Sequence, residues 1–455
     1  MFFHKQLVIS LAALFSMPVT AMAQATEPES PGLEIAGEEE EEDSDRDARE
    51  NPVIIPEESD DIDIPIPTFI KRNANHIIYN GADWGRLRDA FEHSKESPVS
   101  IVHIGDSHVQ ADINTGTVRE LLQYDFGNAG RGLISPLRIC GTNQPRDYVF
   151  QSRNSWNAVK LMNNSWMQTV GFTGTSIRPA SSSSEITIGT PDTDDYNPFS
   201  STTIFHNGKL TVKEVTDDNG NPLHFRAIPS RDYTQIILSS LATKINVSFA
   251  SAGDLTLYGA TLSGDRPGVF YHSIGNNGAT YASYNRIGSV GIGLNPLHPN
   301  LVIISLGTNE AFGRQDMARF KNSIHRLVSN IRNANPDALI LLTTPMECHK
   351  SITTKKRTRV RRKKGRKATY RTVTSKSYAV NGNIAPLRKA ILDYGRENGV
   401  AVYDWYEVAG GTGASSSWIS SNLFAKDRVH HTHKGYNLQG RLLYDAIMDA
   451  LRSQN

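Results

Sequence analysis

The nine residues Val99 to Ser107 read VSIVHIGDS, a β-rich run that leads directly into a serine. Apolar residues at helical spacing follow over Ile113–Tyr124, and the same order of buried strand and amphipathic helix recurs towards the C-terminus. The further strands expected from this pattern are Val269–Ile274, Leu301–Leu306, Ala338–Leu342 and Val400–Tyr403. Alternation of this kind is typical of a parallel sheet flanked by helices, so the sequence predicts an α/β fold.

One long stretch lacks the helical pattern. Between Trp156 and Gly264, short β-rich runs recur between turn signals such as Asn207-Gly208. This arrangement is typical of an all-β sandwich. We therefore expect a sandwich over residues 156–264, inserted into an α/β domain that is made of residues 64–155 and 265–455.

The formal net charge of +1 conceals a strong separation of charge along the chain. Gln24–Asp63 holds 17 acidic and 2 basic residues, which predicts an acidic, disordered linker. Lys355–Lys367 holds ten Lys or Arg in thirteen residues, which predicts a basic loop insertion. Because this loop follows a predicted strand, we expect it at the edge of the sheet where ligands bind. It is either a solvated loop or a surface for a polyanion, such as a wall glycan or the acidic segment of the same chain.

The N-terminus has the features of a secretory signal over Met1–Ala23. A charged start is followed by the apolar run Leu7–Phe15 and by Ala21-Met22-Ala23, a typical cleavage site. The run is too short to span a bilayer, so we expect export to the periplasm or the exterior without stable membrane insertion. In an oxidising compartment Cys140 and Cys348 could pair or remain free thiols, and the sequence leaves both options open.

Four short motifs carry groups that suit ester chemistry. Ser107 stands on a tight strand-to-helix turn, which exposes its hydroxyl. The N–H of Gly275 and the side chain of Asn309 follow predicted strands and could donate hydrogen bonds to an oxyanion. Asp427 precedes His430 by three residues and could orient its imidazole as a base. Each motif alone is also consistent with an ordinary turn, so the inference depends on their order.

Metal binding is the competing interpretation of the last motif. His431 and His433 lie close to His430 and could serve as ligands. The sequence offers no clear companion cluster of ligands elsewhere. We therefore expect neither a metal ion nor a cofactor.

In the order Ser, Gly, Asn and Asp-x-x-His, the motifs resemble those of the SGNH, or GDSL-type, hydrolases. The resemblance implies a flavodoxin-like α/β sandwich and gives each residue a role. Ser107 would be the nucleophile, His430 the base and Asp427 the residue that orients it. The oxyanion would be held by Gly275, Asn309 and the N–H of Ser107.

Longer blocks are similar to the peptidoglycan O-acetylesterase branch of that family. These blocks are GDSH at 105–108, GNAGRG at 127–132, Gly275-x-x-Gly278-Ala279, and GTNEA at 307–311. That branch carries a β-sandwich, similar to carbohydrate-binding modules, between the Ser and Gly blocks. Here the two blocks are 168 residues apart, and the predicted sandwich fills the interval.

The resemblance implies a secreted serine esterase that removes O-acetyl groups from N-acetylmuramic acid in the cell wall. Its partner would be an acetylated glycan, with no role for nucleic acid, and His108, Lys355 and Arg357 are the candidate substrate contacts. Alternatives are an acetyltransferase with the same triad, an esterase for another acetylated polysaccharide, and a non-catalytic wall-binding protein. The sequence leaves the glycan and the acetyl position open.

Overall fold

The computed structural model describes residues 65–191, 197–251, 253–314, 316–360 and 369–453. The predicted signal peptide and acidic linker therefore lie outside the described residues. The central sheet has the strand order β1-β19-β16-β15-β2-β14, and all its neighbours pair in parallel except β1 with β19. The predicted α/β fold is confirmed. In the same order the strands span Ile77–Ile78, Ala401–Tyr403, Leu339–Thr343, Leu301–Ser305, Val99–Gly105 and Val269–Gly275.

Helices cover both faces of this sheet because successive strand residues point to opposite sides. Ile101 of β2 contributes to the core under one set of helices, and Val102 contributes to the core under the other. The first set is α2 (Gly85–Glu92), α4 (Ile113–Phe126) and α11 (His433–Arg452). The second set is α5 (Tyr281–Tyr284), α6 (Val290–Leu294), α7 (Met317–Ala334) and α8 (Ile384–Asn398).

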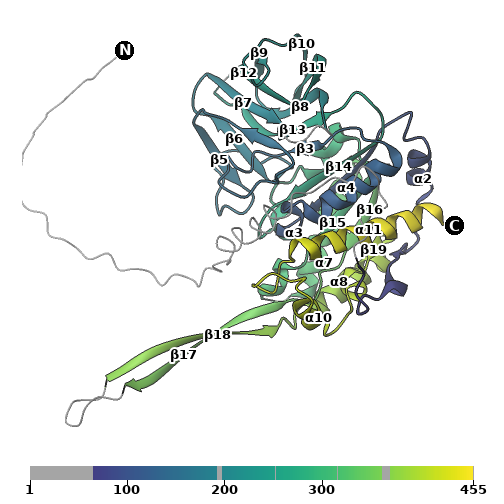
Figure 1. Cartoon of the computed structure of the whole chain (residues 1–455), viewed down its shortest axis with the longest axis vertical. Coiled ribbons are helices and arrows are strands. Elements are labelled where there is room, and N and C mark those ends of the chain that lie inside the picture. The colour runs from purple at the N-terminus through teal and green to yellow at the C-terminus, as the bar shows by residue number, and fades with distance from the viewer. Residues whose placement is uncertain (1–64, 192–196, 252, 315, 361–368, 454–455) are drawn as a thin grey trace, which may run out of the picture.

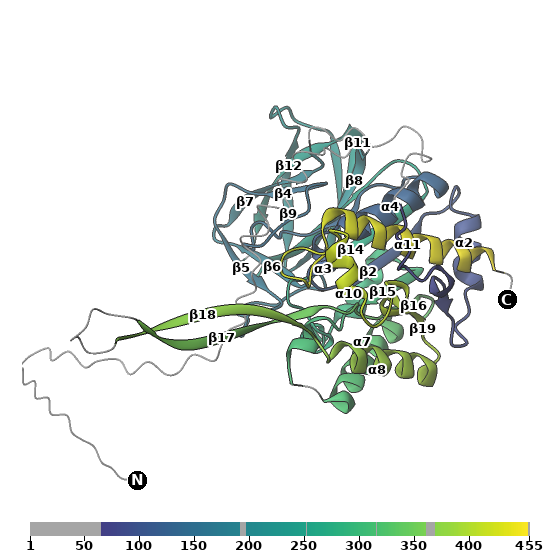
Figure 2. The ribbon, with the colours of Figure 1, turned by 60° about the horizontal axis from the view of Figure 1, so that its bottom comes forward.

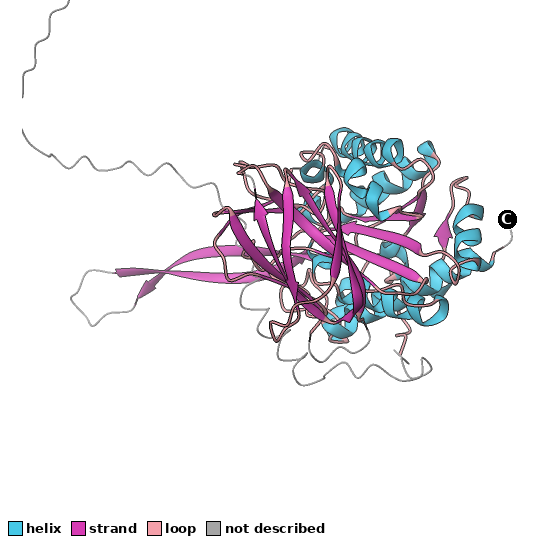
Figure 3. Ribbon diagram, turned by 90° about the horizontal axis from the view of Figure 1, so that it is seen from above, coloured by secondary structure: helices cyan, strands magenta, loops and turns pink. Residues whose placement is uncertain are grey.

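The inserted part is a sandwich of two sheets, whose strands stand to one side of the helices in Figure 3. One sheet has the order β10-β11-β8-β13-β6-β5, with β3 paired to β13, and the other has the order β4-β7-β12-β9. β3 and β4 precede the predicted start of the sandwich at residue 156. The strands are β3 (Gly132–Ile134), β4 (Val149–Gln151), β5 (Trp156–Lys160), β6 (Thr175–Pro179), β7 (Ser183–Gly189), β8 (Phe199–Asn207), β9 (Leu210–Thr216), β10 (Phe225–Pro229), β11 (Tyr233–Ala242), β12 (Lys244–Ser251) and β13 (Thr256–Ser263).

The chain enters and leaves the sandwich at one place. The N–H of Val269 donates to the carbonyl of Gly127 over 2.7 Å, and the N–H of Gly264 donates to the carbonyl of Ala129 over 2.7 Å. Gly268 lies between these bonds with φ +145°, and a Cβ on it would lie 2.2 Å from the oxygen of Gly127. The crossing therefore requires glycine at this position. These bonds fix the start of β14 beside the end of α4.

A two-stranded ribbon projects from the body in Figures 1 and 2. It consists of β17 (His349–Val360) and β18 (Thr369–Val380), and we call these two strands the basic arm. The prediction of a loop from Lys355 is wrong as far as Val360, because these residues form a strand; residues 361–367 lie outside the described residues. Thr, Val and Tyr recur along both strands and favour extended backbone. Neither face carries an apolar row that would have revealed the strands in the sequence.

The two cysteines are not paired with each other. Cys140 and Cys348 are buried free thiols, and they lie in different hydrophobic cores. Burial raises the pKa of each thiol to about 12.

Within the described part of the chain, no helix combines the length and the apolar character needed to cross a membrane.

Candidate active site

Ser107 begins the short helix α3 (Ser107–Gln110), directly after β2. The tight turn before it depends on Gly105, where a Cβ would lie 2.3 Å from the side chain of Val109 and 2.9 Å from the carbonyl of Ser305. The side chain of Asp106 accepts a hydrogen bond from the N–H of His108 over 3.0 Å and so caps this helix. The turn thereby holds the hydroxyl of Ser107 at the carboxyl edge of the sheet.

The hydroxyl of Ser107 lies 2.8 Å from Nε2 of His430. The loop that carries His430 runs between α10 (Ala414–Ser420) and α11. In this loop Oδ1 of Asp427 accepts hydrogen bonds from the N–H groups of Val429 and His430 over 2.9 and 3.0 Å. The other oxygen, Oδ2, is hydrogen-bonded to Nδ1 of His430. The structure therefore brings the predicted serine, histidine and aspartate into one chain of hydrogen bonds.

The charge on Asp427 favours one tautomer of the histidine. Burial alone would raise the pKa of Asp427, but hydrogen bonds from His430 and from two backbone N–H groups lower it to about 2. The ionised carboxylate holds a proton on Nδ1 of His430, which leaves Nε2 free to accept the proton of Ser107. This arrangement suits general-base activation of a hydroxyl.

Two other imidazoles lie beside His430 and are kept neutral. The His108 ring is centred 5.2 Å from the His430 ring, and its Nδ1 lies 3.0 Å from the hydroxyl of Tyr436. Burial lowers the pKa of His108 well below its ordinary value and that of His431 to about 3. Only His430 is bonded to a carboxylate, so a positive charge in this group is stabilised there. His108 is thus at the site, as its prediction as a substrate contact requires.

The predicted oxyanion donors lie at the ends of strands close to β2. Gly275 ends β14 in register with Gly105, and a Cβ on it would lie 2.0 Å from the backbone nitrogen of Gln110 in α3. The side-chain amide of Asn309 donates to Oδ2 of Asp106 over 3.2 Å and to the carbonyl of Ala279 over 3.1 Å. Both amide hydrogens thus already have acceptors, so Asn309 could bind an oxyanion only by giving up one of these bonds.

A polar cluster around Gln110 was not predicted from the sequence. Its side-chain amide donates to Thr142 and to the carbonyl of Asn143, and its oxygen accepts the N–H of Asn277 over 2.7 Å. The side chain of Asn277 in turn donates to that of Asn143 over 2.8 Å. The cluster ties α3 to the loop after Gly275 and to the segment that leads into the sandwich. Its members come from three segments that are far apart in the sequence, so no local pattern could predict it.

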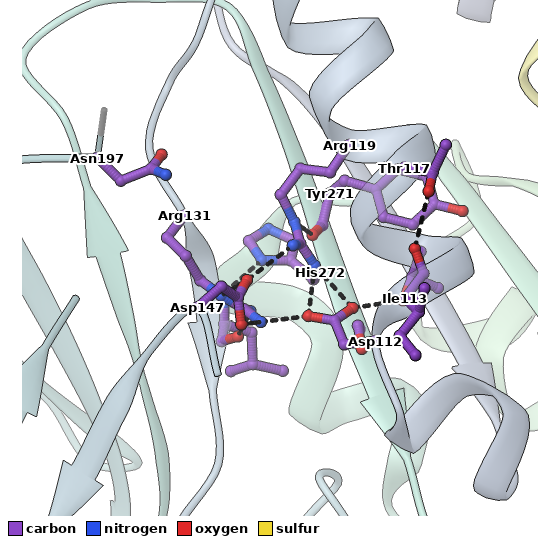
Figure 4. A network of polar contacts seen from close by, with 12 residues as sticks. Asp112, Ile113, Thr117, Arg119, Arg131, Asp147, Asn197, Tyr271 and His272 are labelled. Atoms are coloured by element: carbon purple, nitrogen blue, oxygen red, sulfur yellow. Dashed lines mark hydrogen bonds and ion pairs between the residues drawn. The ribbon is translucent and has the colours of Figure 1, made fainter. Parts of the chain in front are cut away.

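A buried network of ion pairs supports the next part of the chain (Figure 4). Asp112 accepts two bonds of 2.9 Å from Arg119 and pairs with Arg131. Asp147 accepts from both arginines over 3.0 and 2.9 Å. Burial would raise the pKa of Asp112, but the two guanidinium groups lower it below its ordinary value. The network joins the junction of α3 and α4 to β3 and to the segment that precedes β4.

The structure does not bring Lys355 and Arg357 to this site. They lie six and eight residues along β17 from its first residue, about 20 and 26 Å at the usual rise of a strand, and both are exposed. Among the described residues of the arm, its root contacts the loop that carries His430: the N–H of His349 donates to the carbonyl of Arg428 over 2.9 Å. The guanidinium of Arg428 lies 4.5 Å from the centre of the Tyr378 ring.

Comparison with solved structures relates this fold to that of one esterase. A structure of a peptidoglycan O-acetylesterase matches with a TM-score of 0.64 and 20% identity, over 83% of this chain and 99% of that one. A lipase/acylhydrolase from Enterococcus faecalis has 18% identity over 41% and 80% of the chains, with a TM-score of 0.28. A family two carbohydrate esterase from Cellvibrio japonicus has 12% identity over 70% and 97%, with a TM-score of 0.27. The last two scores are too low to bear on the fold.

Comparison with curated proteins gave no significant match. The model of the GDSL-like lipase/acylhydrolase family matches residues 240–438. The matched range begins after Ser107 and contains Gly275, Asn309, Asp427 and His430. The family model therefore does not include Ser107. In the fold, however, β2 and α3 place Ser107 next to the matched segment. Residues 240–438 are therefore similar to the GDSL-like lipase/acylhydrolase family, and the fold is similar to that of a peptidoglycan O-acetylesterase.

Proposed function

We propose that the protein is an exported serine esterase that removes O-acetyl groups from a cell-wall glycan, with O-acetylated peptidoglycan as its substrate. The observation that carries the proposal is the hydrogen-bonded chain from Ser107 through His430 to Asp427, set in this particular fold. The similarity in fold to a peptidoglycan O-acetylesterase extends over 99% of that chain and 83% of this one. It supports the choice of glycan.

The proposed mechanism assigns one role to each of these groups. The hydroxyl of Ser107 attacks the acetyl carbonyl while Nε2 of His430 takes its proton. The N–H groups of Ser107 and Gly275 and the amide of Asn309 stabilise the oxyanion. His430 then returns the proton to the leaving sugar hydroxyl, and an acetyl group remains on Ser107. Water, deprotonated by His430, releases acetate and restores the serine.

The proposal includes the place where the enzyme acts. Met1–Ala23 would direct the chain out of the cytoplasm and be removed, so that the enzyme works in the periplasm or outside the cell. The wall glycan is found there. The β-sandwich, whose strands β3 and β4 join it to the Arg119 and Arg131 network, would hold the glycan next to Ser107.

The test is release of acetate from O-acetylated peptidoglycan, from the same material after de-acetylation, and from acetylated xylan. We expect release from the first substrate only, and its loss in Ser107→Ala and in His430→Ala. Ser416→Ala and His325→Ala, which alter an exposed serine and an exposed histidine, are the matched controls and should retain activity.

Three outcomes would contradict separate parts of the proposal. Activity retained in Ser107→Ala would exclude the assigned nucleophile. Release of acetate from xylan but not from peptidoglycan would be consistent with the proposed mechanism but would exclude peptidoglycan as the substrate. Transfer of the acetyl group to an added acceptor sugar, in place of release as free acetate, would show that the protein is an acetyltransferase.

A further inference from the structure

Almost all of the net positive charge of residues 64–455 lies on one segment. Residues 1–63 carry a net charge of −14 and the whole chain +1, so residues 64–455 carry +15. The segment His349–Val380 holds 13 Lys or Arg and no Asp or Glu, so it contributes +13 of this sum. The remainder of residues 64–455 is close to neutral at +2. The acidic segment Gln24–Asp63, at −15, nearly balances this one segment.

The basic arm has no partner among the described residues that would cover its faces. Its strands pair in continuous register from His349 opposite Val380 to Val360 opposite Thr369. Residues 351–358 and 370–377 are all exposed. A two-stranded ribbon without a buried face is marginally stable in water, and closely spaced like charges repel one another. A segment of opposite charge that lies along the ribbon would relieve both costs.

The acidic segment joins the folded part beside the root of the arm. Its last acid is Asp63, and six residues later the ring of Phe69 lies 6.3 Å from that of Trp418 in α10. In the same short helix, the hydroxyl of Ser415 lies 3.1 Å from Nε2 of His349, the first residue of the arm. Each strand of the arm is 12 residues long, about 40 Å. The 40 residues of the acidic segment could span about 130 Å when extended, which is enough to follow the arm from root to tip.

We propose that the acidic segment Gln24–Asp63 docks on the basic arm of the same chain, with its carboxylates against the Lys and Arg side chains of β17 and β18. Attachment to the same chain gives the segment an effective concentration of about millimolar at the arm. The docked segment excludes other polyanions from the arm. An anionic polymer reaches these bases only when it displaces the segment.

The first test measures the affinity of the full chain for inorganic polyphosphate at low salt. In one variant the six acids of Glu38–Asp43 become Gln and Asn. The matched control makes the same change of charge with six exposed acids of the folded part: Glu92, Glu96, Glu214, Asp232, Asp265 and Asp337. We expect the first variant to bind polyphosphate about tenfold more tightly than the control, a difference of about 1.4 kcal/mol. Equal affinities of the two variants would overturn the proposal.

A second version of this test removes part of the proposed docking surface. When Lys355, Lys356 and Arg357 are changed to Gln, the substitutions at Glu38–Asp43 should lose most of their effect on polyphosphate binding. High salt should also abolish the difference, because it shortens the range of the charge–charge interaction. An effect of the acidic substitutions that persists in full without these three bases would show that the segment docks elsewhere.

The second test maps the contact directly. A carbodiimide joins carboxylates to amines in contact, and we expect peptides that link Glu38–Asp43 to Lys355, Lys356 or Lys376. Links only to lysines outside the arm would contradict the proposal. A mixture of isotope-labelled and unlabelled chains distinguishes docking within one chain from exchange between two chains. Links found only between labelled and unlabelled chains would overturn the assignment to a single chain.

Discussion

The substitution Asp427→Asn should inactivate the enzyme more severely than its small change in shape suggests. An asparagine can keep Oδ1 in place, where it still accepts the N–H groups of Val429 and His430. Its amide nitrogen would then face Nδ1 of His430 and donate to it. The proton of His430 would move to Nε2, which could no longer accept the proton of Ser107.

Two contributions set the size of the loss. The pKa of Asp427 is lowered to about 2 from an ordinary 3.8, mainly by His430, and the same charge stabilises the imidazolium that forms when His430 takes the proton of Ser107. Both side chains are largely buried, at 13% and 26% exposed, so solvent screens this interaction little. The wrong tautomer adds to this, and a fall of about 10⁴ in kcat is the expected total. Asp427→Ala, which donates no hydrogen bond to Nδ1, should retain more activity than Asp427→Asn.

The assay is hydrolysis of a chromogenic acetyl ester, together with the Tm of each variant. Asp316→Asn is the matched control, because Asp316 accepts the N–H of Arg319 three residues later but bonds no imidazole. We expect this control to keep its kcat, and Asp427→Asn to remain folded with a Tm lowered by only a few degrees, because the charge of Asp427 also stabilises the native state. If Asp427→Asn retained more than about a tenth of the kcat, Asp427 would not set the tautomer, and the reasoning would fail.

Two further predictions concern the support of the site. Gly275→Ala puts a Cβ 2.0 Å from the nitrogen of Gln110, so we expect kcat on the same ester to fall by about 10²–10³; Gly382→Ala, with no atom within 4 Å, is its control. Asp112→Asn leaves Asp147 as the only carboxylate partner of the two buried guanidinium groups in this network. Urea unfolding at pH 7 should show that the free energy of unfolding falls by about 3–5 kcal/mol. Because folding lowers the pKa of Asp112, the native protein loses this stabilisation as the pH falls below about 3.8, and the two stability curves should converge in acid. Parallel curves would contradict this origin.

The sheet and its edge were predictable because their signals are local. Predicted strands such as Val99–Ile104 and Val269–Ile274 fall within one residue of β2 and β14. Parallel strands end at a common edge, so residues directly after them had to lie near one another. The bond between Ser107 and His430 needed more than this rule, because His430 lies in a loop whose path no periodicity describes. The order of motifs in a known family supplied that link.

The arm and the buried ion pairs were not predictable in the same way. Strands are recognised by one apolar face, and the arm has none, so its high charge suggested a solvated loop. Arg119 and Arg131 carry no pattern that distinguishes a buried arginine from an exposed one. Their burial follows from Asp112 and Asp147, which approach them only in the folded chain.

The two backbone bonds that close the base of the sandwich also bear on the order of folding. β2 and β14 must pair across more than 160 intervening residues, and closing so long a loop is slow and costs entropy. If the sandwich forms first, the bonds from Val269 to Gly127 and from Gly264 to Ala129 reduce that loop to the few turns of α3 and α4. Gly275 then reaches Ser107 as a neighbour, and an unfolded sandwich would delay assembly of the candidate active site.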